Sequence, residues 1–286
     1  MPDVIELLKK SADFLEEKGI ESPRLNAEIM LADVLNCRRL DLYLMFDRPL
    51  DEPELEKFRA YIRRRIKFEP VQYIVGKTWF YGEEFIVNSN ALIPRQETEF
   101  LIEEILTDTP ADLKVNILDI GTGTGNIPII LSKHLPEAVI TSIDISKAAI
   151  SLAEENEKRI CGKDKINFVN MGAEEFISVP GKKFDIIVSN PPYVSVKEFP
   201  ALQKEITGFE PDIAVTDKAD GLSFYRLITG AGKKLLNPRG KLYFELGKGQ
   251  HTQVAGFMSD NGFIDVSVKK DYAGIERVIK GEIYHV

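Results

Sequence analysis

The residues with the most evident chemistry are Asn190-Pro191-Pro192-Tyr193, which follow the apolar run at 184–189. An Asn side chain offers one acceptor oxygen and two donor hydrogens. Two prolines leave carbonyls with no neighbouring N–H groups to compete for partners. Together with the flat ring of Tyr193, these groups could hold one planar NH2-bearing group by its two hydrogens. An ordinary Pro-Pro turn after a strand would have the same residues, so the tetrapeptide alone leaves both interpretations open.

A second candidate site is the glycine-rich loop Gly121-Thr122-Gly123-Thr124-Gly125, which follows the apolar run at 115–120. Such a loop lets the backbone approach a ligand closely at the start of a helix. The dinucleotide fingerprint G-x-G-x-x-G would have its third glycine at position 126, where this chain has Asn126. The loop therefore disfavours an NAD-dependent dehydrogenase.

Two acids accompany the loop. Asp119 lies just before it, where a carboxylate would repel a pyrophosphate but could accept hydrogen bonds from an ammonium group. Asp144 ends the next apolar run and is placed to accept bonds from two ribose hydroxyls. The combination favours S-adenosylmethionine, which has a ribose, an amino acid and no phosphate. Asp119 could instead be a structural acid bonded to N–H groups of the loop.

The elements that must position these residues alternate between strand and helix from residue 92 onward. Apolar runs end near residues 120, 143, 170 and 189, and helical patterns separate them. This alternation predicts an α/β sheet with helices on both faces, whose ligands bind at the carboxyl ends of the strands. The last two runs, at 263–269 and 275–284, predict a terminal antiparallel pair. We expect residues 92–286 to form one catalytic domain.

The N-terminal part reads as a small helical bundle over residues 1–75. Apolar residues recur at helical spacing over 2–18, and Ser22 before Pro23 predicts the start of a second helix. A shorter helix is expected at 38–46, and Asp51 with Glu54 resembles a capping box opening another. This domain contains no candidate catalytic group, so we expect it to recognise a substrate. Apolar segments around Gly82 predict a β-hairpin linker over 76–91.

Composition limits the classes of function. The 286 residues are 44% hydrophobic and 29% charged, which is ordinary for a globular protein, and no run of about 18 apolar residues predicts a membrane span. Two cysteines and three histidines match no metal-ligand spacing, so no metal is expected. The net charge of −8 disfavours direct binding to nucleic acid. A monomer in a reducing cytoplasm is the expectation.

Five separated motifs resemble those of one family, the HemK-like protein-(glutamine-N5) methyltransferases, which modify the Gly-Gly-Gln motif of peptide chain release factors. The resemblance covers nearly the whole chain, and the motifs occur in the family's order. They are Pro70-Val71-Gln72-Tyr73-Ile74-Val75-Gly76, Leu92-Ile93-Pro94-Arg95-Gln96-Glu97-Thr98-Glu99, Leu118-Asp119-Ile120-Gly121-Thr122-Gly123-Thr124-Gly125, Asn190-Pro191-Pro192-Tyr193, and Phe209-Glu210-Pro211 with Asp220-Gly221-Leu222.

The resemblance implies a class I S-adenosylmethionine-dependent methyltransferase fold, which is Rossmann-like with a mostly parallel seven-stranded sheet. It implies release factors as substrates and Asn190, Pro191, Pro192 and Tyr193 as the catalytic and substrate-binding residues. The cofactor-binding residues would be Asp119, Gly121, Thr122, Gly123, Thr124, Gly125, Asp144, Gly172, Ala173 and Asn190, under a lid formed by Pro94, Arg95 and Glu99.

The chain departs from the family's pattern at two places. Gln96 replaces the usual proline of the lid motif, and Gly172 and Ala173 replace an acid and a bulky residue that meet the adenine. Glu174 or Phe176 is expected to take over those adenine contacts. Three other functions remain open: glutamine methylation of a ribosomal protein, methylation of an exocyclic amine in nucleic acid, and non-catalytic cofactor binding.

Overall fold

The computed structural model describes residues 2–162 and 164–284 and divides into two compact units. The first unit consists of Met1–Lys77 together with Gln203–Phe209, and the second of Thr78–Leu202 with Glu210–Val286. None of the helices in the described part of the chain is long and apolar enough to cross a membrane.

The first unit is a helical bundle around a core that includes Leu8, Leu31 and Phe58. Asp3 caps the first helix by accepting from the Glu6 N–H at 2.8 Å. Its helices are α1 (Val4–Glu17), α2 (Pro23–Val34), the 3₁₀ helix η1 (Arg39–Tyr43), α3 (Glu52–Arg65), α4 (Val71–Val75) and α9 (Lys204–Phe209).

Details of this bundle both confirm and correct the sequence predictions. The capping box at the start of α3 is confirmed, because Asp51 accepts from the Glu54 N–H and Glu54 accepts from the Asp51 N–H. The helix start predicted at Ser22 and Pro23 is confirmed, although Ser22 has left-handed backbone geometry and its side chain makes no capping bond. The short helix expected at 38–46 is a 3₁₀ helix over Arg39–Tyr43.

Segment 203–209 lies with this bundle although it is far away in the sequence. Arg65, only 2% exposed, donates to Asn26 Oδ1 at 2.6 Å and pairs with Glu205 of α9. Gln203 donates to Glu21 Oε2 at 3.0 Å. A buried guanidinium needs such partners, because an unpaired charge in the interior is costly.

The second unit is built on a seven-stranded sheet in the order β5-β4-β3-β6-β7-β9-β8. The neighbours from β5 to β7 pair in parallel, and β9 pairs with both β7 and β8 in antiparallel fashion. The mostly parallel sheet and the antiparallel pairing of the last two strands are confirmed, whereas the pairing of β9 with β7 was not predicted. Its strands are β3 (Asn116–Ile120), β4 (Val139–Asp144), β5 (Ile166–Asn170), β6 (Phe184–Ser189), β7 (Leu236–Glu245), β8 (Phe263–Lys270) and β9 (Glu276–Ile283).

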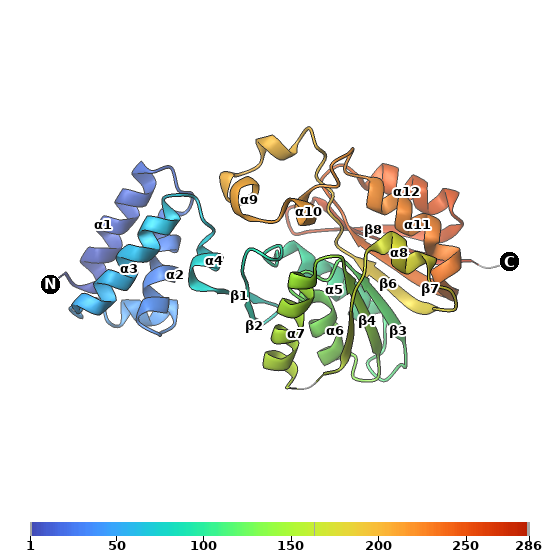
Figure 1. The fold of residues 1–286 in the computed structure, drawn as a ribbon, viewed down its shortest axis with the longest axis horizontal. Helices are drawn as coiled ribbons and strands as arrows, with labels where there is room; N and C mark the ends of the chain where they lie inside the picture. Colours follow the sequence, from blue (N-terminus) through green and yellow to red (C-terminus); the bar gives the residue numbers. More distant parts are fainter. Residues whose placement is uncertain (1, 163, 285–286) are drawn as a thin grey trace. The chain divides into compact units, whose positions relative to one another are not determined.

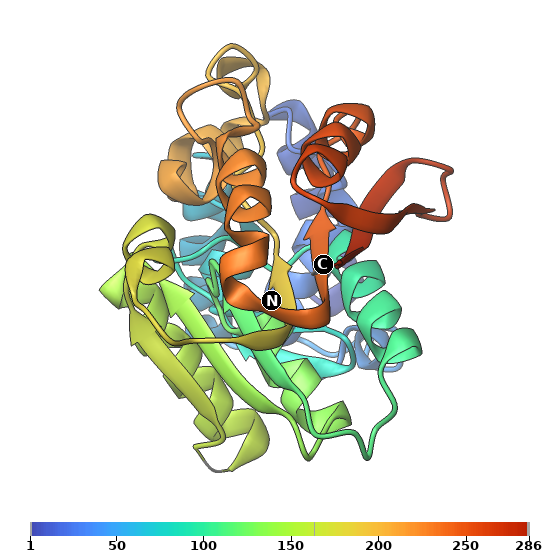
Figure 2. The ribbon, with the colours of Figure 1, turned by 90° about the vertical axis from the view of Figure 1, so that its right-hand side faces the viewer.

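Helices cover both faces of this sheet (Figures 1 and 2). Alternate residues of the central strand β3 point to opposite faces: Ile117 belongs to the core formed with α5 and α6, and Leu118 to the core formed with α8, α11 and α12. The helices of this unit are α5 (Glu97–Asp108), α6 (Asn126–His134), α7 (Lys147–Cys161), α8 (Ala173–Ser178), α10 (Asp212–Val215), α11 (Ser223–Leu235) and α12 (His251–Asp260), with the 3₁₀ helix η2 (Phe199–Ala201).

The predicted hairpin is present as β1 (Lys77–Phe80) and β2 (Glu83–Ile86), which form a separate two-stranded sheet. Asn156 of α7 joins this hairpin to the glycine-rich loop. Its Oδ1 accepts from the Ile86 N–H at 2.7 Å, and its Nδ2 donates to the carbonyls of Ile86 and Thr124, both at 3.0 Å. The hairpin thereby supports the loop that leads into α6.

Candidate active site

A cavity lies at the carboxyl ends of β3, β4 and β6, where an open α/β sheet binds its ligands. It lies wholly within the second unit. The sequence-predicted residues that line it are Pro94, Arg95, Gly121, Thr122, Gly123, Thr124, Asp144, Gly172, Ala173, Asn190, Pro191 and Pro192. The predicted residues outside its lining are Glu99, Asp119, Gly125 and Tyr193.

The glycine-rich loop turns sharply out of β3. The N–H groups of Gly121 and Thr122 both donate to the Ile143 carbonyl, at 2.9 and 3.1 Å. Gly121 has φ +85°, a left-handed geometry that favours glycine. Gly125 also has a left-handed φ, and a Cβ there would come within 3.0 Å of Ala153 Cβ. Gly125 thus permits close packing of α7 against the loop and does not line the cavity.

Asp144, at the end of β4, also holds the glycine-rich loop in place. Its Oδ2 accepts from the Gly123 N–H at 3.0 Å, and its Oδ1 accepts from the Ser146 N–H at 2.8 Å. Burial raises its pKa, and these two hydrogen bonds act in the opposite direction. Each carboxylate oxygen can accept a further bond, so the side chain that orders the loop retains acceptor capacity at the cavity.

Asp119 is completely buried behind the loop. Its Oδ2 accepts from Ser142 Oγ at 2.6 Å, while its Oδ1 and the neighbouring Thr122 Oγ1 have no hydrogen-bond partner among the described residues. Burial raises the pKa of Asp119 to about 7. The loop N–H groups for which sequence analysis offered Asp119 as an alternative acceptor bond instead to Ile143 and Asp144.

The cavity lining includes four apolar residues that sequence analysis did not identify: Ile145, Met171, Ile213 and Phe224. Glu174 is exposed and Phe176 is completely buried in the core against α11, and neither lines the cavity. The expectation that one of them replaces the missing adenine contacts was therefore wrong. The helical turn of α8 directs Phe176 inward.

Asn190 also lines the cavity and lies beside the first turn of α5. Its Nδ2 donates to Thr98 Oγ1 at 3.2 Å, and Thr98 Oγ1 donates to Glu245 Oε2 at 2.5 Å. Thr98 and Glu245 are each 1% exposed. Glu245 ends β7, lies buried behind Thr98 and does not line the cavity.

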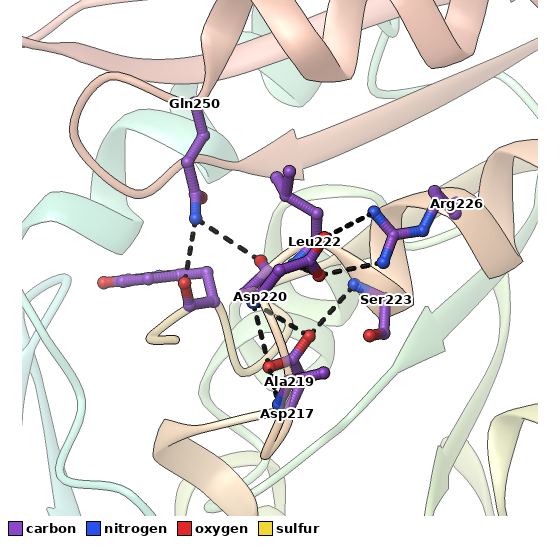
Figure 3. Close-up of polar contacts among 9 residues, drawn as sticks. Asp217, Ala219, Asp220, Leu222, Ser223, Arg226 and Gln250 are labelled. Carbon is purple, nitrogen blue, oxygen red and sulfur yellow. Dashed lines mark hydrogen bonds and ion pairs between the residues drawn. The ribbon is translucent and has the colours of Figure 1, made fainter. Parts of the chain in front are cut away.

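Tyr193 is held by both its side chain and its backbone. Its hydroxyl donates to Glu245 Oε1 at 3.4 Å, and its carbonyl accepts from Gln250 Nε2 at 2.8 Å. Gln250 also donates to the Gly221 carbonyl at 3.3 Å, at the loop before α11. Figure 3 shows how Asp217 orders that loop, with its carboxylate accepting from backbone N–H groups that include that of Ser223.

The expected lid residues separate into two groups. Arg95 donates to Glu210 Oε1 at 2.5 Å, and Glu210 Oε2 accepts from the Ile93 N–H at 3.4 Å. This ion pair holds segments 93–95 and 210–211 together at the cavity, and Glu210 was not recognised as a site residue from the sequence. Glu99 instead accepts from the Tyr81 N–H at 2.8 Å and supports the hairpin.

The cavity suits S-adenosylmethionine by the chemistry of its lining. Asp144 offers acceptors for ribose hydroxyls, and Ile145, Met171 and Phe224 provide apolar walls for a flat base. Among the described residues of the lining, the one Lys or Arg, Arg95, is engaged by Glu210, which fits a ligand without phosphate. Within residues 2–162 and 164–284, no group of His, Cys, Asp or Glu side chains is arranged to hold a metal ion.

The sheet order and the cavity define a class I S-adenosylmethionine-dependent methyltransferase. A solved structure of a methyltransferase from Pyrococcus furiosus has the same fold, with a TM-score of 0.52 at 17% identity over 72% of this chain and 91% of that one. The family model of the PrmC N-terminal domain matches residues 6–76, and that of the methyltransferase small domain matches residues 95–207.

Relatives of known name are similar over nearly their whole length. The release factor glutamine methyltransferase of Geobacter sulfurreducens is 42% identical, over 94% of this chain and 93% of its own. That of Chlorobaculum tepidum is 40% identical, over 96% and 95%. The chain belongs to the family of release factor glutamine methyltransferases.

Proposed function

We propose that the protein transfers a methyl group from S-adenosylmethionine to the side-chain amide nitrogen, N5, of the glutamine in the Gly-Gly-Gln motif of peptide chain release factors. The observation that carries the proposal is the Asn190-Pro191-Pro192 segment at the cavity beside the glycine-rich loop, in a chain 42% identical to a release factor glutamine methyltransferase. The target atom and the target motif come from the family resemblance.

The chemistry demanded of the chain follows from the substrate. An amide nitrogen is a poor nucleophile, because its lone pair is delocalised into the carbonyl. The bound cofactor supplies an electrophilic methyl group on a sulfonium. Asn190 Oδ1 and the Pro191 carbonyl would each accept one hydrogen of the substrate NH2 and direct its lone pair toward the methyl. Both acceptors gain strength as positive charge grows on the nitrogen, which is electrostatic stabilisation of the transition state.

The remaining residues would act by positioning. Asp144 and the loop over Gly121–Gly125 would hold the ribose and amino-acid parts of the cofactor, and Gly172 and Ala173 would leave room for its adenine. Arg95, paired with Glu210, would close the cavity beside Pro94. That the Tyr193 ring covers the substrate amide stays a prediction, because this side chain does not line the cavity. No base is required before transfer, since the proton can leave the nitrogen afterwards.

Release factors act at the ribosome, so we place the reaction in the cytoplasm. Direct nucleic-acid binding is not expected, because the chain carries a net charge of −8. Action as a monomer stays a prediction.

The test is transfer of labelled methyl from S-adenosylmethionine to a purified release factor, beside a copy whose motif glutamine is replaced by alanine. Label on the first protein and none on the second is expected. Absence of label from both would contradict the assignment. Ribosomal proteins and nucleic acid, tested in parallel, represent the two rival substrates, and preferential labelling of either would replace the release factor.

A further inference from the structure

Glu245 is a buried carboxylate that the reaction as described does not use. It is 1% exposed and does not line the cavity, yet its two oxygens accept from Thr98 Oγ1 and from the Tyr193 hydroxyl. Thr98 is hydrogen-bonded to Asn190, and Tyr193 belongs to the same segment, Asn190-Pro191-Pro192-Tyr193. Burying a carboxylate costs free energy unless the carboxylate is hydrogen-bonded. Here one of its two hydrogen-bond partners, Thr98, is itself hydrogen-bonded to Asn190.

A count of hydrogens shows what these bonds determine. The Thr98 hydroxyl has a single hydrogen. When Glu245 is ionised, it can only accept, so Thr98 must donate to it, and Thr98 Oγ1 is left as an acceptor. Asn190 must then present its NH2 to Thr98, as the 3.2 Å contact from Nδ2 has it. The Asn190 carbonyl oxygen remains available to accept hydrogens elsewhere.

We propose that Glu245 is a positioning residue that, through Thr98, determines which end of the Asn190 side-chain amide is available to the substrate. The proposal rests on the proposed function, in which Asn190 Oδ1 accepts a hydrogen of the substrate amide. In the opposite orientation Asn190 would offer NH2 hydrogens to the NH2 of the substrate, and the two donors would repel. We call the hydrogen bonds from Asn190 through Thr98 to Glu245 the relay. The relay therefore decides whether the same set of residues forms a productive or an unproductive site.

Protonation of Glu245 would permit the opposite orientation. A protonated carboxyl can donate to Thr98 Oγ1, after which the Thr98 hydrogen is free to bond to Asn190 Oδ1. Burial raises the pKa of Glu245 to about 7, and the nearby Glu97 carboxylate adds to the effect. Arg277, the Thr98 hydroxyl and the Tyr193 hydroxyl lower it. On the remaining side, the Tyr225 hydroxyl donates to the backbone carbonyl of Glu245 at 2.8 Å.

Turnover should therefore fall as the pH falls through about 7. Above pH about 7 Glu245 is ionised and Asn190 is held in the productive orientation. Below that pH the carboxyl is protonated and the productive fraction falls. At one pH unit below the pKa, about one tenth of the carboxyl is ionised, so kcat should drop roughly tenfold if only that form is productive.

The first test separates positioning from packing at Thr98. Thr98→Val keeps the shape of the side chain and removes its hydroxyl, whereas Thr98→Ser keeps the hydroxyl and removes a methyl. We expect Thr98→Val to lower kcat roughly 10²-fold, with little change in the KM for the release factor, because Asn190 loses its orientation. Thr98→Ser should retain most of kcat. Equal losses in both variants, or wild-type kcat in Thr98→Val, would overturn the proposal.

The second test uses the pH profile. Glu245→Gln has one donor end and one acceptor end at every pH, as the protonated carboxyl has, so it should turn over at the low level of the acid form and show no change of kcat near pH 7. The same decline in Glu245→Gln and wild type would overturn the proposal. So would a wild-type profile without a decline between pH 8 and pH 5.5.

Both tests begin with the wild-type protein methylating a release factor. If that reaction is absent, the proposed function has failed and the relay is not at issue. If it is present and the variants behave alike, the relay alone has failed. Circular dichroism and the Kd for S-adenosylmethionine, measured on every variant, identify one that is misfolded. A Thr98→Val protein that loses both folding and cofactor binding leaves the decision to the pH profiles of wild type and Glu245→Gln.

Discussion

The Gln250 side chain donates from Nε2 to the Tyr193 carbonyl at 2.8 Å, and so joins α12 to the segment that would hold the substrate amide. The same group reaches the Gly221 carbonyl at 3.3 Å, at the loop shown in Figure 3. A Cβ at Gly221 would come within 2.4 Å of the Tyr193 carbonyl oxygen. The Asn190-Pro191-Pro192-Tyr193 segment is thus positioned by a loop and a helix that lie later in the sequence.

Replacing Gln250 should loosen this segment. In Gln250→Leu the carbonyls of Tyr193 and Gly221 lose a donor, which we expect to cost about 1 to 3 kcal/mol of unfolding free energy and to lower kcat several-fold. Chemical denaturation and steady-state kinetics measure the two effects. Gln253→Leu, at an exposed position of α12, whose N-cap residue is Gln250, is the matched control. Equal behaviour of the two variants would show that the contact with Tyr193 is dispensable.

Asn190 should matter for turnover more than for cofactor binding. Asn190→Ala removes one of the two acceptors proposed for the substrate amide, and loss of one such electrostatic contact typically lowers kcat about 10²- to 10³-fold. The Kd for S-adenosylmethionine, measured by calorimetry, should change little, since the glycine-rich loop and Asp144 remain. A variant that turns over normally, or that loses cofactor binding and turnover together, would contradict this division of roles.

The ion pair between Arg95 and Glu210 should contribute to holding the cofactor. Glu210→Gln keeps the shape of the side chain but leaves the Arg95 guanidinium without its charged partner at the cavity. We expect the Kd for S-adenosylmethionine to rise about tenfold, the equivalent of about 1.4 kcal/mol. Glu6→Gln, which removes an exposed partner of Lys10 on the helical bundle, should leave that Kd unchanged. Unchanged affinity in Glu210→Gln would exclude this contribution.

Asp119 should make stability depend on pH. Its pKa is raised from near 3.9 in the unfolded chain to about 7 in the folded protein. Its favourable contribution is therefore complete below pH about 4, declines as the pH rises to about 7, and does not change further. Over that interval the wild type should lose up to about 4 kcal/mol relative to Asp119→Asn, by denaturant unfolding at each pH. Parallel curves for the two proteins would contradict the raised pKa.

The Asp119→Asn variant also distinguishes the two roles considered for Asp119, which are binding the ammonium group of the cofactor and stabilising the fold. If its carboxylate accepts from the ammonium group of the cofactor, Asp119→Asn should bind S-adenosylmethionine several-fold more weakly at pH 8. If Asp119 serves only the fold, the affinity should not change. The buried Oδ1, which has no partner among the described residues, favours the first outcome.

Sequence reasoning succeeded where the signal is local. Apolar runs ending at residues 120, 143 and 189 predicted strands, and the residues that follow them meet at one edge of the sheet because parallel strands share that edge. It failed where a role depends on contacts between distant residues. Glu245 meets Thr98 across 147 positions and Glu210 meets Arg95 across 115, and no local sequence pattern indicates either pairing.

An unpredicted helix and an incorrectly predicted contact have different physical causes. Helix α12 was not predicted, because the apolar residues at 254–258 are interrupted by Gly256 and form only a short pattern. The adenine contact proposed for Phe176 assumed that sequence position after β5 fixes direction. The helical period of α8 instead directs that ring to the core, where it packs with Phe184 at a centroid distance of 6.2 Å.

The most direct test of the account is the position of the methyl group on the product. A release factor treated with the protein and S-adenosylmethionine would be digested and its peptides sequenced by mass spectrometry. We predict one added methyl, located on the side-chain amide of the glutamine in the Gly-Gly-Gln motif, and an initial rate of its formation about 10²- to 10³-fold lower with the Asn190→Ala variant. A methyl on any other residue, or the same rate with the variant, would contradict the proposed function.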